Sequence, residues 1–226
     1  MEITMYDTLL QLPLFQGLCK DDFTCIIEKV KFHFRNYNED EIIAKQGEPC
    51  NQLIFLLEGN LSIQTIDETH DFRLTETIAS PAVIEPYSLF GMYTRFNATY
   101  QVQGQAKLLF IDKSYILSEL SNYEIFRLNY LNILSNRVQV TSHKLWNNHI
   151  GTLKEKLANF ILLRSFKPEG EKKLQIGMED LARLINETRI NVSKTLNDLQ
   201  NKGLVQLKRK EILIPDTKAF ANELLS

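Results

Sequence analysis

The sequence predicts an α+β protein with three consecutive parts: a β-rich domain at residues 1–112, a long helix at 113–148, and a small helical domain with a basic hairpin at 149–226. Short apolar runs separated by turn residues fill residues 31–111, which is typical of strands. Neither Gly nor Pro occurs between Asp112 and Gly151, so no helix-breaking residue interrupts the helix predicted for this stretch. After Gly151, helical periods lead into an alternating hairpin pattern.

The composition is that of an ordinary globular protein. Of the 226 residues, 44% are hydrophobic and 24% are charged, which excludes a disordered or collagen-like chain. No apolar run approaches the roughly 20 residues that a membrane-spanning helix needs. Residues 1–4 lack the basic and apolar start of an export signal. We therefore expect a cytoplasmic protein without a membrane partner.

The cysteines and histidines do not form a metal-binding pattern. The three cysteines include no CxxC pair, and the four histidines have no HxH or HExxH spacing. We expect no metal site and no disulfide framework.

The two ends of the chain carry opposite net charge. Residues 1–150 hold 12 basic and 18 acidic residues, whereas residues 151–226 hold 14 basic and 10 acidic residues. A basic segment behind an acidic one favours a polyanionic partner for the C-terminal domain.

The strand signals begin after two short helical segments, the second of which starts with the charged residues Lys20, Asp21 and Asp22. From Lys31 the period changes, and about eight evenly spaced short strands favour a sandwich or jelly roll. The runs are Phe32/Phe34, Ile42/Ile43, Leu53–Leu57, Leu61/Ile63, Leu74–Ile78, Val83/Ile84 and Leu108–Ile111.

The predicted long helix carries a mainly apolar seam whose members step by three and four residues in turn. This is the a/d spacing of a two-stranded coiled coil. In the first half of the helix, the same spacing places the charged residues Glu124 and Arg127 on the seam. We therefore expect the apolar helix–helix interface in the second half. A helix that buries the stripe on its own domain is the alternative. The seam consists of Leu131, Leu134, Val138, Thr141 and Leu145.

Residues 178–202 predict a helix-turn-helix. Ala182 is small enough for two helices to cross closely, and Asn is the commonest non-glycine residue at positive φ, which suits Asn186 to the turn. Thr188 suits the N-cap of the second helix. The inward faces of the two helices hold Leu181, Ile185, Val192, Leu196 and Leu199.

The outward face of the second helix has side chains suited to DNA. Arg pairs in bidentate fashion with guanine and Asn with adenine, while Ser and Lys suit phosphates or bases. Gly203 ends the helix, and the following hairpin carries three consecutive cations at its tip, as expected for a wing that neutralises phosphates. A helical module that docks a protein is the alternative. The candidate DNA-binding residues are Thr188, Arg189, Asn191, Ser193, Lys194, Asn197, Lys208, Arg209 and Lys210.

With these parts in place, nearly the whole chain resembles the Crp/Fnr superfamily of transcription regulators. Gly47 and Gly59 bracket the apolar strand Leu53–Leu57 as in the family's β-roll, and Arg137–Ser142 is similar to the family's dimer helix. The resemblance implies an N-terminal β-roll (double-stranded jelly-roll) sensor domain, a long dimerisation helix and a C-terminal winged helix-turn-helix. It also implies a homodimer on double-stranded DNA with a palindromic operator, half-sites about 34 Å apart, and contact with RNA polymerase.

The resemblance also places the family's effector pocket. Its phosphate-binding Arg-Ser pair falls on Asn97-Ala98, so both side chains are missing. Arg95 lies two positions upstream and needs a local shift or bulge to point inward. Because an uncompensated buried phosphate is costly, we expect neither cyclic AMP nor another cofactor, and the effector stays unassigned. The family's Gly-Glu pair falls on Ile84-Glu85 and its purine contacts on Thr141 and Ser142, which gives the pocket Ile84, Glu85, Arg95, Asn97, Ala98, Thr141 and Ser142.

Other cofactors of the family have little support. An iron–sulfur cluster requires four cysteine ligands and the chain has three. Haem could take a histidine, methionine or cysteine side chain as its axial ligand, but each such residue of this chain is explained more simply as a surface or core residue.

The recognition helix departs from the family pattern Arg-Glu-x-x-x-Arg. Arg189 is kept, Ile190 replaces the Glu that pairs with cytosine, and Lys194 replaces the Arg fork that pairs with guanine. We therefore expect a different half-site. A cupin-like metal-dependent enzyme on the same jelly roll is the enzymatic alternative, but the β region supplies only His33 and His70, so we predict a non-enzymatic regulator.

Overall fold

The computed structural model describes residues 9–147 and 151–225, and the chain divides into two compact units. The first unit contains Met1–Ser62 and Ile78–Arg137, and the second contains Ile63–Thr77 and Val138–Ser226. These boundaries differ from the predicted 1–112, 113–148 and 149–226, because they pass through a strand hairpin and through the long helix. The tip of the hairpin therefore groups with the C-terminal part of the chain.

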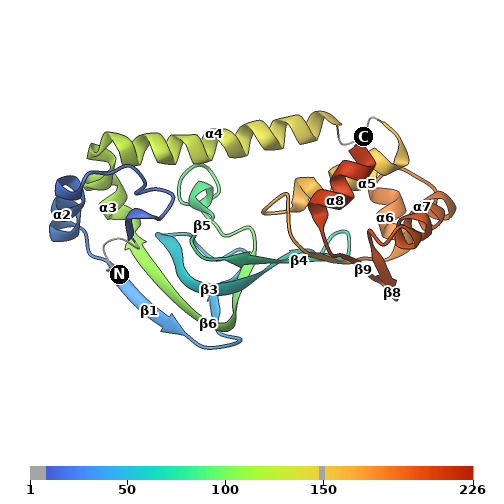
Figure 1. Ribbon diagram of the computed structural model, residues 1–226, viewed down its shortest axis with the longest axis horizontal. Helices are drawn as coiled ribbons and strands as arrows, with labels where there is room; N and C mark the ends of the chain where they lie inside the picture. The colour runs from blue at the N-terminus through green and yellow to red at the C-terminus, as the bar shows by residue number, and fades with distance from the viewer. Residues whose placement is uncertain (1–8, 148–150, 226) are drawn as a thin grey trace. The chain divides into compact units, whose positions relative to one another are not determined.

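The first unit is built on antiparallel strands (Figure 1). Strand β6 hydrogen-bonds to β1 and β3, with His33 opposite Phe110 in the β1–β6 pair. Strand β2 also pairs with β6, and β5 pairs with β3. The predicted α+β class and β-rich domain are confirmed. The strands are β1 (His33–Tyr37), β2 (Ile42–Ala44), β3 (Gln52–Asp67), β4 (Phe72–Ala79), β5 (Ala82–Ile84) and β6 (Thr99–Asp112).

The strands of the described chain up to residue 112 are fewer and longer than the sequence predicts. Leu53–Leu57 and Leu61/Ile63, predicted as separate strands, both belong to β3. Gly59 joins them with a φ of 92°, at a point where a Cβ atom would lie 2.2 Å from the carbonyl oxygen of Gln105. Only glycine allows so close an approach of the neighbouring strand, so the strand continues through a residue that usually interrupts one.

Aromatic side chains fill the helical end of the first unit. Helix α2 (Lys20–Lys29) buries Phe23, whose ring centroid lies 5.5 Å from that of Phe15. Phe15 also lies 5.5 Å from Phe55 of β3 and 5.6 Å from Phe126 of the long helix. The apolar face of α2, the sheet and the long helix thus share one core.

The predicted helix at 113–148 is interrupted. It consists of α3 (Lys113–Ser118), the 3₁₀ turn η2 (Leu120–Asn122) and α4 (Glu124–Asn147). The Ser121 hydroxyl donates to the carbonyl oxygen of Leu117, and the Asn122 amide donates to that of Ser118. Such side-chain bonds to the backbone compete with helix hydrogen bonds, and the buried Leu120 ties the turn to the core. Prediction of one unbroken helix was therefore wrong.

The second unit combines a sheet, which includes the end of β3, with a helical bundle. Its sheet runs β4–β7–β9–β8, with β7 antiparallel to both β4 and β9. Strand β7 and the last helix were not predicted from the sequence, because both are short. The elements are α5 (Leu153–Arg164), β7 (Lys172–Gln175), α6 (Met178–Leu184), α7 (Arg189–Asn201), β8 (Gln206–Lys208), β9 (Glu211–Ile214) and α8 (Thr217–Leu225).

A buried ion pair joins β4 to β7 inside the second unit. Lys172 Nζ lies 2.8 Å from Glu76 Oε2, with side-chain exposures of 1% and 3%. Glu76 also accepts the Phe166 backbone N–H at 2.5 Å, and Lys172 donates to the Glu169 carbonyl oxygen at 2.7 Å. Both charges therefore have additional partners, as buried charges require.

None of the described helices has both the length and the apolar character that a bilayer-spanning helix needs.

Candidate nucleic-acid interface

Helices α6 and α7 form the predicted helix-turn-helix. Asn186 adopts a φ of 53° in the turn, and the Glu187 N–H donates to the Ala182 carbonyl oxygen at 2.9 Å. Ala182 is 4% exposed at the helix crossing. The small residue and the left-handed Asn thus have the positions that the sequence predicts, and the motif is confirmed.

Both ends of α7 are fixed by local hydrogen bonds. The Thr188 hydroxyl accepts the Asn191 backbone N–H at 3.3 Å, which caps the N-terminus. At the other end Gly203 has a φ of 72°. Its N–H donates to the Gln200 carbonyl oxygen, and the Leu204 N–H donates to the Leu199 carbonyl oxygen. This pair of bonds is a Schellman motif. The direction of α7, and so of its first turns, is set by its own sequence.

The first turns of α7 present the predicted polar side chains to solvent. Arg189, Asn191, Lys194 and Asn197 are exposed and Ser193 is half-buried, whereas Val192 is buried. A shallow surface hollow brings together Arg189, Ile190, Ser193, Lys194, Asn197 and Asp198. Asn191 does not line this hollow.

Ile190 was not predicted as a site residue, although it is 79% exposed within this polar surface. The available signal was its position: it precedes the inward-facing Val192 by two residues, so helical spacing alone turns it outward.

The wing is also present. Lys208, Arg209 and Lys210 are exposed on the hairpin of β8 and β9, and Lys210 takes a left-handed φ of 58°. Glu211 Oε2 lies 2.9 Å from Lys173 Nζ and Glu211 Oε1 lies 3.6 Å from Lys208 Nζ. The hydrogen bond from Lys173 lowers the pKa of the Glu211 carboxyl. Arg209 and Lys210 form no such pair among the described residues.

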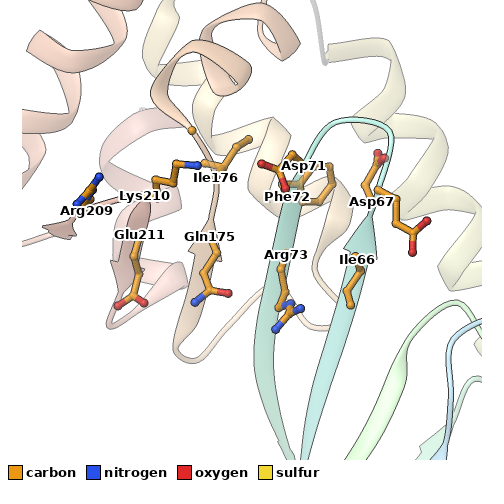
Figure 2. A pocket seen from close by; sticks show the side chains of 12 residues that line it. Ile66, Asp67, Asp71, Phe72, Arg73, Gln175, Ile176, Arg209, Lys210 and Glu211 are labelled. Carbon is orange, nitrogen blue, oxygen red and sulfur yellow. The ribbon is translucent and has the colours of Figure 1, made fainter.

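A hollow of about 510 Å³ lies beside the wing within the second unit (Figure 2). The end of β3 and the loop after it line one side with Asp67 and Asp71, and the wing lines the other with Arg209 and Lys210. Because acidic and basic groups are mixed, the hollow does not present the single sign of charge that a phosphate ligand selects. The candidate recognition surface is therefore the face of α7 together with the wing tip.

A second candidate site lies in the first unit, where the Glu85 carboxylate is 1% exposed. Its Oε1 accepts the N–H groups of Asn97 and Ala98, each at 3.1 Å, and the Tyr100 hydroxyl at 2.9 Å. Its Oε2 accepts the Asn97 N–H at 2.9 Å, the Asn97 side-chain amide at 3.0 Å and the Ser88 hydroxyl at 2.6 Å. Ser88 and Tyr100 were not among the predicted pocket residues.

The other predicted effector residues are placed differently. Ile84 is buried at the end of β5. The exposed Arg95 donates to the Gly47 carbonyl oxygen at 2.7 Å, so its guanidinium is engaged away from Glu85. Thr141 and Ser142 belong to the second unit, so the structure does not join them to this cluster. Within the described ranges no group of three or more potential ligands is arranged to hold a metal ion.

The predicted seam of α4 is largely uncovered. Leu131 is 57% exposed and Val138 is 67% exposed, while Leu134 and Thr141 are half-buried. The Leu145 side chain lies outside the described residues. The alternative that the chain buries this stripe on its own domain is wrong for Leu131 and Val138.

Two family models match this chain in the same order as its parts. A cyclic nucleotide-binding domain matches residues 34–123, and a Crp-like helix-turn-helix domain matches residues 155–223. Together they span well over half of the chain. It belongs to the Crp/Fnr family of transcription regulators.

Relatives of this Crp/Fnr regulator agree with that assignment. Electron transport regulator A of Shewanella oneidensis is 25% identical over 204 residues, which is 87% of this chain and 78% of the relative. The anaerobic regulatory protein of Pasteurella multocida is 24% identical over 214 residues, 88% of this chain and 73% of the relative. The catabolite activator protein of Thermus thermophilus shares the fold, with a TM-score of 0.52 and 20% identity over 94% of this chain and 99% of that one. This Crp/Fnr protein is thus a DNA-binding transcription regulator.

The domain match implies a cyclic nucleotide, and the Glu85 cluster does not fit the phosphate of one. The N–H groups of Asn97 and Ala98 already donate to the Glu85 carboxylate. Among the residues described, no ion pair joins a basic side chain to Glu85 or supplies a cation to this cluster. A phosphate would therefore find neither free donors nor a counter-charge.

Proposed function

We propose that this Crp/Fnr regulator is a homodimer that binds a palindromic operator through two winged helix-turn-helix domains. The observation that carries the proposal is the exposed face of α7, where Arg189, Lys194 and Asn197 line one surface hollow. Recognition helices of this type enter the major groove with their N-terminal residues. The cations of the wing, Arg209 and Lys210, suit the phosphates beside the groove.

The dimer is supported by the uncovered seam of α4. Apolar side chains that recur at heptad spacing and stay in contact with water favour a second helix as their partner. Two parallel copies of α4 would give two-fold symmetry, and the two recognition helices would then meet half-sites about 34 Å apart.

Regulation is proposed to involve a small effector other than cyclic AMP. The effector would bind one arrangement of the two DNA-binding domains better than the other and so shift their populations. We propose that the hinge for this change is at 147–151, of which residues 148–150 lie outside the described ones. We further propose that the dimer acts in the cytoplasm, contacts RNA polymerase and catalyses no reaction.

Selection of genomic DNA fragments by the purified full chain tests this function. We expect a shared palindromic sequence among the bound fragments, with two half-sites about one helical turn apart. Binding of the selected operator should weaken steeply with added salt, because phosphate contacts release counterions.

The rivals give different results in the same assay. A protein-interaction module would select no DNA sequence and show no salt-dependent binding to random duplexes. A cupin-like enzyme would carry a stoichiometric metal ion, which metal analysis of the purified protein would detect. Failure to select any duplex, with or without cell metabolite extract, would contradict the proposed function.

A further inference from the structure

The Glu85 cluster has the construction of an anion-binding site. Successive backbone N–H groups at Asn97 and Ala98 point at one position, and the hydroxyls of Ser88 and Tyr100 donate to the same position. Successive N–H groups form concave nests that bind anions such as phosphate and carboxylate. In this chain the position is filled by the carboxylate of Glu85 itself, which is almost entirely buried.

The backbone at Glu85 takes a conformation that its sequence disfavours. Its φ of 37° and ψ of 53° lie in the left-handed region, which glycine adopts readily and glutamate rarely. Pro86 follows, and a residue before proline normally takes an extended conformation. The family's Gly-Glu pair corresponds to Ile84-Glu85, so its glycine falls on Ile84. In this chain the left-handed residue is Glu85 instead. Such a conformation persists only where the surroundings fix it, and here six hydrogen bonds hold the carboxylate.

The charge of the cluster opposes a second anion. Within the described part of the chain no lysine or arginine pairs with Glu85, and Arg95 bonds to the Gly47 carbonyl oxygen. An entering phosphate would meet a like charge at contact distance without a counter-charge. It would have to displace the carboxylate from all of its donors at once.

We propose that Glu85 is an internal anion that occupies the anion nest of the β-roll, so that this domain holds no phosphate-bearing ligand there. An effector that acts on the domain is then recognised at another surface. The inference concerns the first unit alone, and it stands or falls independently of the dimer and the operator.

The test replaces Glu85 with glycine, which suits the left-handed backbone and empties the nest. The full chain is melted with inorganic phosphate or cyclic AMP, with sodium chloride at equal ionic strength as the reference. Phosphate at about 100 times its Kd should raise the Tm of E85G by about 5 °C more than that of the wild type. E85Q, which still fills the nest, and E58Q, which removes an exposed charge from the same unit, should respond like the wild type.

Two outcomes would overturn the proposal. One is a wild-type Tm that rises with cyclic AMP or phosphate as much as that of E85G does. The other is a folded E85G that gains no more from phosphate than the wild type.

Should E85G fail to fold, NMR of the wild type decides the question. The backbone amide signals of Asn97 and Ala98 should stay in place when cyclic AMP or phosphate is added, because the carboxylate keeps these donors. Saturable shifts of both signals would contradict an internally filled nest.

Discussion

At the residue scale, Arg189 is the residue of α7 that we propose contacts a base edge. Its guanidinium lies 3.6 Å from Glu179, but both side chains are well exposed, and such surface pairs contribute little. DNA can therefore displace Glu179 at small cost. We expect Arg189→Ala to weaken cognate binding by about 1–3 kcal/mol and to relax specificity at one base pair. Gel shifts on the operator and on single-base variants of it measure this.

Lys208→Ala is the matched control for Arg189→Ala, because Lys208 lies on the wing. It should weaken binding to all sequences about equally and make the salt dependence shallower. Equal loss on every sequence for Arg189→Ala as well would make Arg189 a phosphate contact.

Ile190 is expected to contact a thymine methyl group. It is 79% exposed in the hollow that it shares with Arg189 and Ser193. An apolar side chain in the major groove pairs naturally with the thymine C5-methyl. Replacing that thymine with uracil should cost the wild type about 1 kcal/mol per contact and cost Ile190→Ala almost nothing. If every thymine-to-uracil change lowers the DNA affinity of the wild type and of Ile190→Ala equally, Ile190 contacts no thymine methyl group.

Cys50 gives the first unit a pH dependence. Burial raises the pKa of its thiol from 9.0 to about 11, and the negative charge of Glu85 adds to the rise. The folded state therefore holds this proton more tightly than the unfolded state. The stabilisation is complete below about pH 9 and is lost as the pH rises toward 11.

Urea unfolding in the presence of a reductant measures this effect. Between about pH 7.5 and 10.5 the wild type should lose about 2 kcal/mol more stability than Cys50→Ala. Burial also raises the pKa of Tyr130, and this part of its alkaline loss is common to both proteins, whereas Cys50→Ala removes the smaller rise that Cys50 causes. If the stability of the wild type and that of Cys50→Ala depend on pH in the same way, folding does not raise the pKa of the Cys50 thiol.

How far the sequence predicts a residue depends on how local its partners are. Asn186 and Thr188 act through backbone groups within a few residues, so their type and spacing sufficed to predict them. The donors to Glu85 lie from three to 15 residues away along the chain, and only the folded chain brings them together. The family resemblance placed Glu85 in the effector pocket without revealing that its own carboxylate fills the nest.

At the element scale, the β4–β7 junction depends on the buried pair Glu76–Lys172. Removing one partner leaves an uncompensated buried charge, so Glu76→Gln or Lys172→Met should each cost about 3–5 kcal/mol. The double variant removes both charges, and its glutamine still offers an oxygen to the Phe166 N–H. It should therefore cost clearly less than the sum of the single variants.

A double-mutant cycle in urea measures the coupling between Glu76 and Lys172. The exposed pair Lys202–Glu223 in the same unit is the control, and its single variants should change stability little, because solvent screens an exposed pair. Strict additivity at Glu76 and Lys172 would contradict an energetic role for the buried pair.

The same junction shows why some elements could not be predicted. Strand β7 has four residues, and its Lys172 is buried only because Glu76 of another strand meets it. Nothing local marks such a lysine as interior. The interruption at η2 was missed for a related reason, since Ser121 and Asn122 are compatible with a helix until their side chains bond back to the backbone. In contrast, the helical period after Gly151 was enough to predict α5, and the structure shows that a capping box of Thr152 and Glu155 fixes its start.

At the scale of the whole molecule, the seam of α4 determines whether two chains act together. Leu131 and Val138 are a heptad apart and mostly exposed, so charged replacements should leave each chain folded. The double variant Leu131→Glu/Val138→Glu would place four carboxylates in the proposed interface and remove about 1.5–3 kcal/mol of burial per side chain. We expect it to sediment as a 26.3 kDa monomer where the wild type is a dimer.

Loss of the dimer should also change DNA binding in a specific way. Two linked half-site contacts gain affinity from their high effective concentration, so the variant should lose roughly 10²-fold or more on the full palindrome. Its affinity for an isolated half-site should match that of the wild type, because α7 and the wing are unchanged. Asn136→Glu adds a charge to an exposed position outside the seam and should remain dimeric. A Leu131→Glu/Val138→Glu protein that stays dimeric would place the interface elsewhere on the chain.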